Sequence, residues 1–195
     1  MLNRDIDEVL MDENGQACGV KAGNEMAKAS MVIGDPTYFS RDKIQPTGQV
    51  VRCICFLNHP IPDTGDNHSA QIIIPGPQVG RKNDIFVCSV SSSHAVSAAG
   101  IYIAIVSTKM ETGEPEKEIA PGLALLGNIM QRFTTVATTY EPVGDGTEDK
   151  CFISSSFDGT SHFESDCDDL LSLYKRVTGE DLDMTINADS VEADY

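Results

Sequence analysis

Apolar and polar residues alternate in short runs along most of the chain, in the pattern that extended strands produce. In the first 30 residues two such runs flank Asn14-Gly15, a dipeptide typical of tight hairpin turns because both residues tolerate positive φ. A second turn at residues 23–25 leads to the apolar run 31–34 (MVIG). This part of the chain therefore predicts a hairpin, a further turn and one short buried strand.

The middle of the chain predicts a series of strands. Apolar runs occur at residues 50–57 (VVRCICFL), 71–75 (QIIIP), 84–90 (DIFVCSV) and 100–108 (GIYIAIVST). An antiparallel meander is the most economical arrangement of such a series. Residues 37–44 (TYFSRDKI) favour instead a short helix, which Pro46 and Gly48 would end.

Helical signals come later in the chain. Pro115 and Pro121 can each occupy the first turn of a helix, where the missing N–H costs nothing. Spacings of three and four place Leu123, Leu126 and Met130 on one apolar stripe. Two further strands are predicted at residues 132–143 and 150–158, around the turn between them.

The last predicted helix follows Ser165, which can cap it with Asp168 three residues on. Gly179 supplies the end of this helix. The apolar face expected to be buried consists of Leu170, Leu173, Tyr174 and Val177. Residues 181–195 carry no core pattern, and we expect an acidic, disordered tail there.

The net charge of −16 over 195 residues argues against nucleic-acid binding, which needs clustered Lys and Arg. It also disfavours a direct electrostatic hold on an anionic membrane. The first ten residues carry acids where a signal peptide has a basic patch and an apolar stretch. The sequence therefore predicts a cytosolic or nuclear protein with no nucleic-acid partner.

The six cysteines show neither a C-x-x-C pair nor a spacing that would bind zinc. Cys53 and Cys55 alternate with Arg52 and Ile54, so both thiols should point to one face of a strand. Without a secretion signal, we expect the cysteines to be reduced and structural.

No motif for nucleotide binding or catalysis is present in the sequence: there is no G-x-G-x-x-G, P-loop or G-x-S-x-G. Residues 91–93 are serines next to His94, but adjacent residues do not give the geometry of nucleophile and base, so a polar loop is expected. A further charged segment, expected to be a solvated helix start, contains Lys109, Glu111, Glu114, Glu116, Lys117 and Glu118. The residues alone predict a soluble α+β domain without catalytic activity.

One series of segments keeps its order along the chain and begins with residues 71–75 (QIIIP), 79–87 (V-x-RK-x-DI-F-V), 91–96 (S-x-x-H-x-V) and 100–108 (G-x-YIAI-x-ST). Others are VIGDPTYF, GQVVRCICFLNHPI, PEKE at 115–118, YEP at 140–142, and residues 160–164 and 168–179. This series resembles the Rab GDP-dissociation inhibitors, a family related to the Rab escort proteins. Its compact spacing is more similar to the inhibitors than to the escort proteins.

The resemblance implies an α+β fold built like the flavoprotein oxidases, of which residues 1–180 match the last part of the large multisheet domain. Strand 31–34 would then return to the dinucleotide-type sheet. The family's Gly-rich turn, most of its Rab-binding platform and its lipid-binding helical domain precede the matching region. Met1 would lie at the edge of the platform as an internal methionine. We therefore expect the chain alone to be poorly soluble and unable to extract Rab.

The function implied by the resemblance is that of a carrier without a reaction or a cofactor. Such a protein binds GDP-bound, prenylated Rab GTPases, slows GDP release and extracts Rab during transient encounters with membranes. Its expected location is the cytosol. One alternative is the substrate-side portion of an FAD-dependent oxidoreductase of the same architecture, which a yellow flavin absorbance would indicate. Another is a β-rich interaction module unrelated to Rab.

Overall fold

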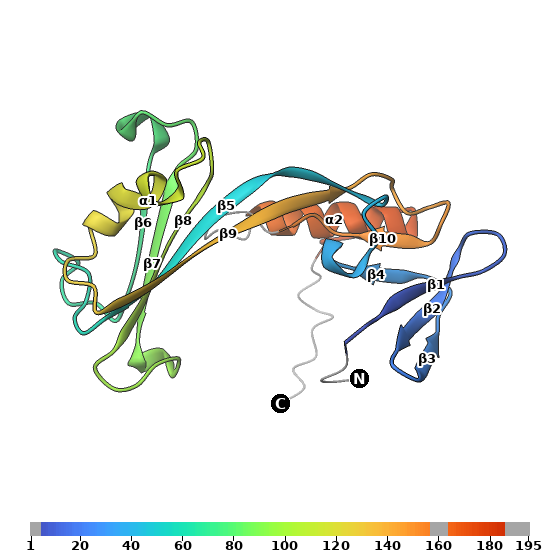
Figure 1. The fold of residues 1–195 in the computed structure, drawn as a ribbon, viewed down its shortest axis with the longest axis horizontal. Coiled ribbons are helices and arrows are strands. Elements are labelled where there is room, and N and C mark those ends of the chain that lie inside the picture. Colours follow the sequence, from blue (N-terminus) through green and yellow to red (C-terminus); the bar gives the residue numbers. More distant parts are fainter. Residues whose placement is uncertain (1–4, 157–163, 186–195) are drawn as a thin grey trace.

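The computed structural model describes residues 5–156 and 164–185. These residues form two β-rich lobes joined by a long two-stranded ribbon (Figure 1). The described part is dominated by strands, with two α-helices and three short 3-10 helices. This agrees with the fold class expected from the sequence.

A three-stranded antiparallel sheet opens the chain. It consists of β1 (Glu8–Met11), β2 (Ala17–Ala22) and β3 (Glu25–Lys28), in that order. The turn between β1 and β2 contains Gly15 at φ 76°, a conformation that glycine adopts without steric cost. The carboxylate of Asp12 accepts hydrogen bonds from two backbone N–H groups of this turn. Both predicted turns of this region are confirmed.

A parallel pair of strands lies beside this sheet. β4 (Val32–Gly34) pairs with β10 (Cys151–Ile153), although more than 100 residues separate them in the chain. The sequence predicted that this segment and the preceding strand flank a common turn. In the structure, β10 pairs with β4 instead. The expectation of a buried strand at 31–34 is wrong in part, because Ile33 is 54% exposed.

The second lobe is built on a five-stranded antiparallel sheet. Its strands are β5 (Ile44–Leu57), β6 (Ser69–Ile74), β7 (Ile85–Ser91), β8 (Tyr102–Lys109) and β9 (Gln131–Pro142). Their order is β6-β7-β8-β5-β9, so β6, β7 and β8 form the predicted meander. β5 then lies between β8 and β9, an arrangement that the meander did not predict.

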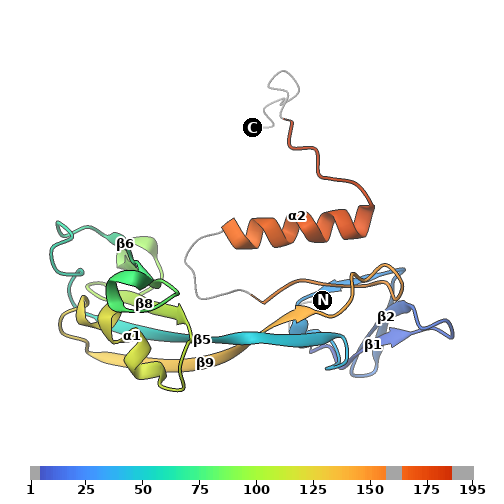
Figure 2. The same cartoon turned by 90° about the horizontal axis from the view of Figure 1, so that it is seen from above.

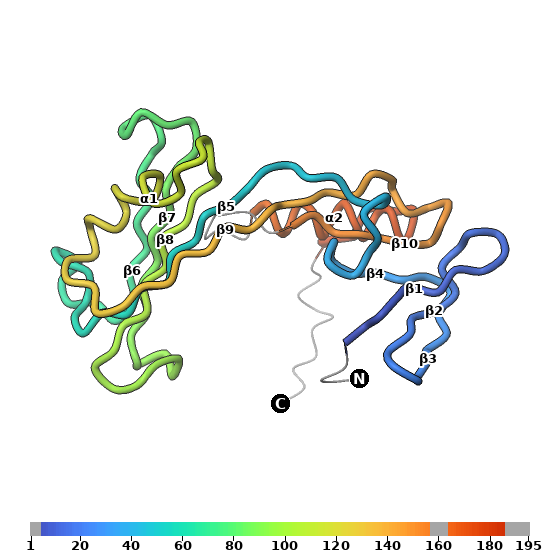
Figure 3. Tube along the Cα trace, viewed as in Figure 1, coloured from blue at the N-terminus to red at the C-terminus, as the bar shows by residue number. Residues whose placement is uncertain are grey.

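The ribbon is the first part of β5 paired with the last part of β9. From Val50 onward β5 pairs with both β8 and β9, whereas its first residues pair with β9 alone. The two strands therefore leave the five-stranded sheet together and run side by side to the other lobe (Figures 2 and 3). The connection between the lobes is thus a hydrogen-bonded ladder.

The helix expected at residues 37–44 is wrong. The structure has a 3-10 helix, η1 (Pro36–Tyr38), whose start is capped by the side chain of Asp35. Pro46 and Gly48 lie inside β5, at the point where its register with β9 shifts. Proline is tolerated in a strand at such an irregularity, where the ladder lacks a regular N–H donor.

Helix α1 (Pro115–Ala124) begins at a predicted proline but ends earlier than expected. Pro121 lies in its second half, so its prediction as a first-turn residue is wrong. Leu123 and Leu126 are buried, although Leu126 already lies beyond the helix, and Met130 of the same predicted stripe is 56% exposed. The backbone N–H of Met130 donates to the carbonyl of Phe56, because the chain has already turned into β9.

The main core lies between α1 and one face of the five-stranded sheet. Ile119 of α1 and Val51, Val87 and Val106 of the sheet are fully buried there. Two short 3-10 helices, η2 (Gly76–Val79) and η3 (Ser92–His94), follow β6 and β7 at the ends of the sheet. A second, smaller cluster, which includes Phe39, packs the first lobe.

Helix α2 (Glu164–Thr178) packs against β10 and differs from the prediction in its exposed face. Leu173 is buried, but Leu170 is 59% exposed and Tyr174 is 40% exposed. Ser165 lies within the helix, so its prediction as the cap is wrong. The helix ends at Thr178, and the predicted stop Gly179 follows it with φ 83° and with its N–H donating to the carbonyl of Lys175.

Residues 181–185 form neither helix nor strand. The remainder of the predicted tail, 186–195, lies outside the described residues, so the tail and the domain boundary at residue 180 stay predictions. Within the described ranges, no helix combines the length and the apolar character needed to cross a membrane.

Candidate functional site

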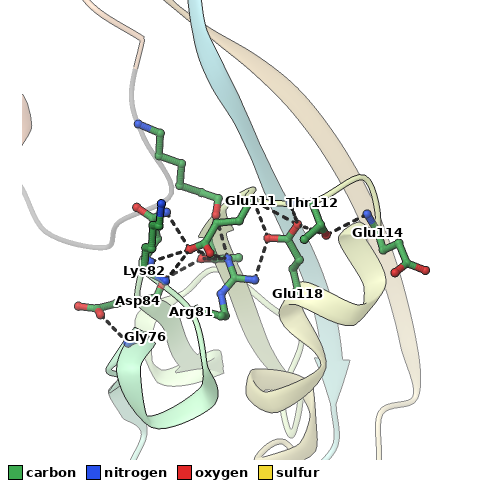
Figure 4. A network of polar contacts seen from close by, with 11 residues as sticks. Gly76, Arg81, Lys82, Asp84, Glu111, Thr112, Glu114 and Glu118 are labelled. Atoms are coloured by element: carbon green, nitrogen blue, oxygen red, sulfur yellow. Dashed lines mark hydrogen bonds and ion pairs between the residues drawn. The ribbon is translucent and has the colours of Figure 1, made fainter.

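The turn between β6 and β7 holds an arginine that points back into the protein (Figure 4). After η2, Gly80 adopts a left-handed conformation at φ 71°, and Arg81 follows it with a side chain only 10% exposed. Its Nη1 lies 2.7 Å from Oε2 of Glu118 on α1. Glu118 itself is 4% exposed, so its prediction as part of a solvated helix start is wrong.

The buried carboxylate of Glu118 is surrounded by donors. It accepts hydrogen bonds from the backbone N–H groups of Glu111 (2.9 Å) and Thr112 (2.6 Å) and from the Thr112 hydroxyl (2.6 Å). Burial alone would raise the pKa of this carboxyl. The hydrogen bonds from Thr112 and Glu111 and the contact with Arg81 outweigh burial and hold the pKa below its ordinary value. Glu118 is therefore a stable anion inside the fold.

Glu111 fastens the same turn from the other side. Its Oε1 accepts hydrogen bonds from the backbone N–H groups of Lys82 (2.9 Å) and Asn83 (2.7 Å) and from the Asn83 side chain (2.9 Å). These bonds, the backbone N–H of Asn83 first, lower the pKa of Glu111. Nη2 of Arg81 lies 3.7 Å from the same oxygen. We call Arg81, Glu111 and Glu118 the Arg81 clamp.

The Arg81 clamp has a structural role. Nη2 of Arg81 also donates to the carbonyl of Lys109 (3.0 Å), so the guanidinium faces protein acceptors along one edge. An arginine held in this way does not offer a free fork to an external carboxylate or phosphate. The clamp instead ties three segments to one another: the turn 76–84, the loop 109–114 and helix α1.

A second candidate site is a pocket at the carboxyl ends of β4 and β10. In open sheets of parallel strands, ligands bind outside these ends. The pocket has a volume of about 240 Å³ and hydroxyl groups in its walls. Its lining comprises Asp35, Pro36, Thr37, Val50, Arg52, Thr135, Ala137, Thr138, Thr139, Ser155 and Ser156. This volume is below the roughly 300–1,000 Å³ of sites for drug-sized ligands, so it does not fit a whole dinucleotide.

The hydroxyls at this pocket are engaged by neighbouring protein groups. Ser155 donates from its backbone N–H (3.0 Å) and its hydroxyl (2.9 Å) to the carboxylate of Asp169 on α2. The Thr37 hydroxyl donates to Asp35. No cluster of three His, Cys, Asp or Glu side chains suited to a metal occurs among the described residues. The bonds from Ser155 to Asp169 therefore connect the end of β10 to α2.

The serines at 91–93 meet a histidine that the sequence did not indicate. Nδ1 of His68 lies 3.2 Å from the hydroxyl oxygens of both Ser91 and Ser93, whereas His94 lies on η3. No carboxylate in the described part of the chain bonds to His68, so the third group of a catalytic triad is missing there. Periodicity could not reveal this contact, because it joins residues 23 or more positions apart.

The predicted platform residue, Met1, lies outside the described residues. Its role stays a prediction.

Comparisons with known proteins converge on one family. The family model described as "GDP dissociation inhibitor" matches residues 1–189. A probable secretory pathway GDP dissociation inhibitor 1 of Schizosaccharomyces pombe is 52% identical over 182 residues, which are 93% of this chain and 41% of the relative. Rab GDP dissociation inhibitor beta of Canis lupus familiaris is 50% identical over 183 residues, again 41% of its length.

The fold agrees with the sequence comparisons. The crystal structure of a Rab GDI from Plasmodium falciparum matches with a TM-score of 0.87 and 42% identity, over 92% of this chain and 41% of that one. A peptidyl tryptophan dihydroxylase aligns at 12% identity with a TM-score of 0.46, which lends no support to the oxidoreductase alternative. This chain spans about two fifths of the length of its curated relatives. On the match over residues 1–189, the chain belongs to the GDP dissociation inhibitor family.

Proposed function

We propose that this chain acts as part of a Rab GDP dissociation inhibitor. In this role it serves a protein that binds GDP-bound, prenylated Rab GTPases, slows the release of GDP and withdraws Rab from membranes into the cytosol. The observation that carries the proposal is the family match over residues 1–189, which runs through both lobes. The names of the relatives, which include Rab GDP dissociation inhibitor beta, support the choice of GTPase.

The physical task of such a protein is binding, without a reaction of its own. A prenyl chain in a membrane is stabilised by about 0.8 kcal/mol for each buried CH₂ group, so a carrier must replace that environment. It must also bind the GDP state more tightly than the GTP state, since only differential affinity shifts the equilibrium. We propose that the described lobes contribute the scaffold on which these contacts are arranged.

The scaffold role is supported by how the lobes are fixed. The Arg81 clamp holds the end of the five-stranded sheet, and the β5–β9 ribbon connects that sheet to the first lobe. The clamp and the ribbon fix the positions of the sheet and of the two lobes, and neither presents a reactive group. We further propose that the protein works in the cytosol and meets membranes only transiently.

The experiment is a chimera in which residues 1–189 replace the matched part of the S. pombe relative. GDP release is measured from prenylated Rab loaded with fluorescent GDP, together with Rab extraction from liposomes. We expect the chimera to slow GDP release and to extract Rab as the unmodified relative does. The reason is that residues 1–189 should hold the Rab-binding platform of the relative in its usual position. The unmodified relative and buffer alone are the two reference points.

A folded chimera that neither slows GDP release nor extracts Rab would refute the proposal. Circular dichroism and the thermal transition of the chimera separate this result from simple misfolding. The flavin alternative is tested in the same preparation, since a bound flavin would give it a yellow absorbance.

A further inference from the structure

A groove follows the open edge of the three-stranded sheet. Among the described residues β1 pairs only with β2, and β3 lies on the far side of β2 (Figure 1). Residues from both faces of β1 line a space of about 340 Å³, together with η1 and the segment after it, whereas no residue of β2 or β3 does. We call this space the β1 groove, and its lining comprises Ile6, Asp7, Glu8, Val9, Met11, Thr37, Tyr38, Phe39, Ser40 and Lys43.

The inner wall of the β1 groove is apolar and is held by the fold. Phe39 is 8% exposed and belongs to the smaller core cluster, and Val9 packs against that cluster. Met11 and Tyr38 add apolar surface at the rim, with 39% and 52% exposed. A cavity of about 150 Å³ already admits a molecule of the size of benzene, so the groove has room for a large apolar side chain.

The edge strand itself is shaped toward the groove. The register of β1 with β2 shifts between Leu10 and Met11. Irregularities of this kind at a sheet edge redirect a side chain, and here Met11 lines the groove. The methionine side chain is flexible and polarisable, so it adapts to ligands of different shape. An open edge strand also presents unpaired backbone groups to a further strand.

The edge carries a strong negative charge. Residues 5–13 contain no Lys or Arg, and their acidic members are Asp5, Asp7, Glu8, Asp12 and Glu13. Lys21 lies 3.8 Å from Glu8, but both side chains are about half-exposed, so water screens this pair. The lysine of the lining, Lys43, is already paired with Asp149 at 2.5 Å. The β1 groove therefore combines an apolar wall with an excess of carboxylates.

We propose that the β1 groove binds an extended segment of a partner protein in which apolar side chains alternate with Lys or Arg. The segment adds to β1 as a further strand, a mode in which main-chain hydrogen bonds supply affinity and pockets for alternate side chains supply specificity. One apolar side chain enters the groove, and the basic side chains lie against the carboxylates of residues 5–13. This inference goes beyond the proposed Rab function and does not depend on it.

Two other occupants fit the edge less well. A second copy of this chain would set the carboxylates of residues 5–13 against those of its own kind, and like charges opposite one another destabilise strand pairing. An anionic membrane surface is repelled by the same charges. The carboxylates therefore oppose self-pairing at this edge and select a basic chain.

The first test measures binding of a fluorescein-labelled peptide, KVKVKVKV, by fluorescence anisotropy. Its controls are EVEVEVEV, which reverses the charge, and KVKPKVKV, whose proline removes a main-chain donor. We expect KVKVKVKV to bind about tenfold more tightly than either control and to bind more weakly as NaCl is added. Equal binding of EVEVEVEV would overturn the basic partner, and equal binding of KVKPKVKV would overturn the pairing with β1.

The second test locates the peptide with Met11→Lys and uses Met26→Lys as the matched control. Met26 lies on β3, the opposite edge of the same sheet, and is 69% exposed. Both substitutions add one positive charge, so a general attraction between the acidic chain and a basic peptide changes equally in the two variants. We expect Met11→Lys to weaken binding of KVKVKVKV about tenfold and Met26→Lys to leave it nearly unchanged. Equal effects of the two substitutions would contradict the proposal.

Hydrogen exchange gives a readout that needs no substitution. Bound KVKVKVKV should slow the exchange of amides in β1 and leave those of β3 unchanged, because pairing protects only the strand that the peptide joins. Protection of β3, or of neither strand, would overturn the proposal.

All measurements are made with the 195-residue chain and repeated with the S. pombe chimera. Binding to the chain that is lost in the chimera would overturn the proposal, since the groove would then be covered in the longer protein. Where only one of the two proteins folds, as judged by circular dichroism, that protein decides the outcome. The result is separate from that of the Rab assays, because peptide binding is scored whether or not the chimera extracts Rab.

Discussion

At the scale of single residues, Glu118 is the one charged side chain among the buried polar residues of the described structure. Its carboxylate is buried and is compensated by Arg81 and by donors from the loop before α1. Removing one partner of a buried pair leaves the other charge without compensation, which costs about 3–5 kcal/mol in known cases. The clamp is therefore sensitive to changes that leave its shape intact.

We expect Glu118→Gln to lower the free energy of unfolding by about 2–4 kcal/mol, because the amide keeps the volume but cannot neutralise Arg81. Urea unfolding measures this change. The matched control is Glu116→Gln, whose carboxylate is half-exposed and pairs with Arg132 at 3.2 Å. Exposed pairs contribute about 0–1 kcal/mol, so equal losses in the two variants would contradict a buried clamp.

The clamp also predicts how stability depends on pH. The pKa of Glu118 is lowered in the folded protein from its ordinary value of 4.5, so the unfolded chain binds the proton more readily. The stabilisation is therefore fully present above about pH 4.5 and is lost as pH falls through the folded value. We expect unfolding free energies between pH 7 and pH 3 to fall less steeply in Glu118→Gln. An unchanged slope would show that other carboxylates dominate.

The cysteines on the covered face should be chemically inert. Sγ of Cys53 and Sγ of Cys55 lie 3.6 Å apart in the core, and burial, followed by the neighbouring Cys53, raises the pKa of Cys55 to about 12. Both side chains are fully buried, and the reactive thiolate of Cys55 is disfavoured, so we expect both to resist a thiol reagent at pH 7.5 until the protein unfolds. Cys167 on α2 is exposed and should react first. Mass spectrometry of the labelled peptides gives the order of reaction.

At the scale of elements, local signals predicted local pairings. The Asn14-Gly15 turn identified the first hairpin, and the runs on either side of the turn 76–84 identified β6 and β7. The parallel pairing of β4 with β10 could not be found in this way, because nothing within a window of the sequence marks a partner so distant. The same limit hid the contact of Arg81 with Glu118, which buries the last residue of the charged segment.

For helix α2, the sequence predicted more burial than the structure shows. Helical spacing correctly selected Leu173 as a buried residue, but it selected Leu170 and Tyr174 with equal weight. Periodicity reports which side of a helix is apolar and does not report how much of that side a neighbour covers. The short parallel pair beneath α2 is too narrow to cover the whole face.

Gly122, the one glycine of α1, should not tolerate a side chain. A Cβ placed there would lie 2.5 Å from Cγ1 of Val106, because the helix packs closely on the sheet. We expect Gly122→Ala to destabilise the protein by about 1–3 kcal/mol, as overpacking of a core does. Gly113→Ala is the control, since a Cβ there meets no atom within 4 Å. Thermal unfolding that ranks the two variants in the reverse order would refute this packing.

At the scale of the whole molecule, the layout depends on the pairing of residues 44–57 with residues 131–142. Strand propensity identified most of each segment, yet it could not show that the two continue together beyond the sheet as a ribbon. The family resemblance anticipated the class of fold and the mixture of sheets. The two-lobed arrangement itself follows from a contact that only the folded chain displays.

The ribbon has a mechanical consequence. Its cross-strand hydrogen bonds oppose sliding and stretching, while a two-stranded ladder twists more readily than a wide sheet. The separation of the lobes is therefore held nearly constant, and their relative rotation is the soft coordinate. A partner that binds both lobes and rotates one relative to the other would have to twist the ribbon about its long axis. We expect most of this twist to occur at the register irregularity between Pro46 and Gly48.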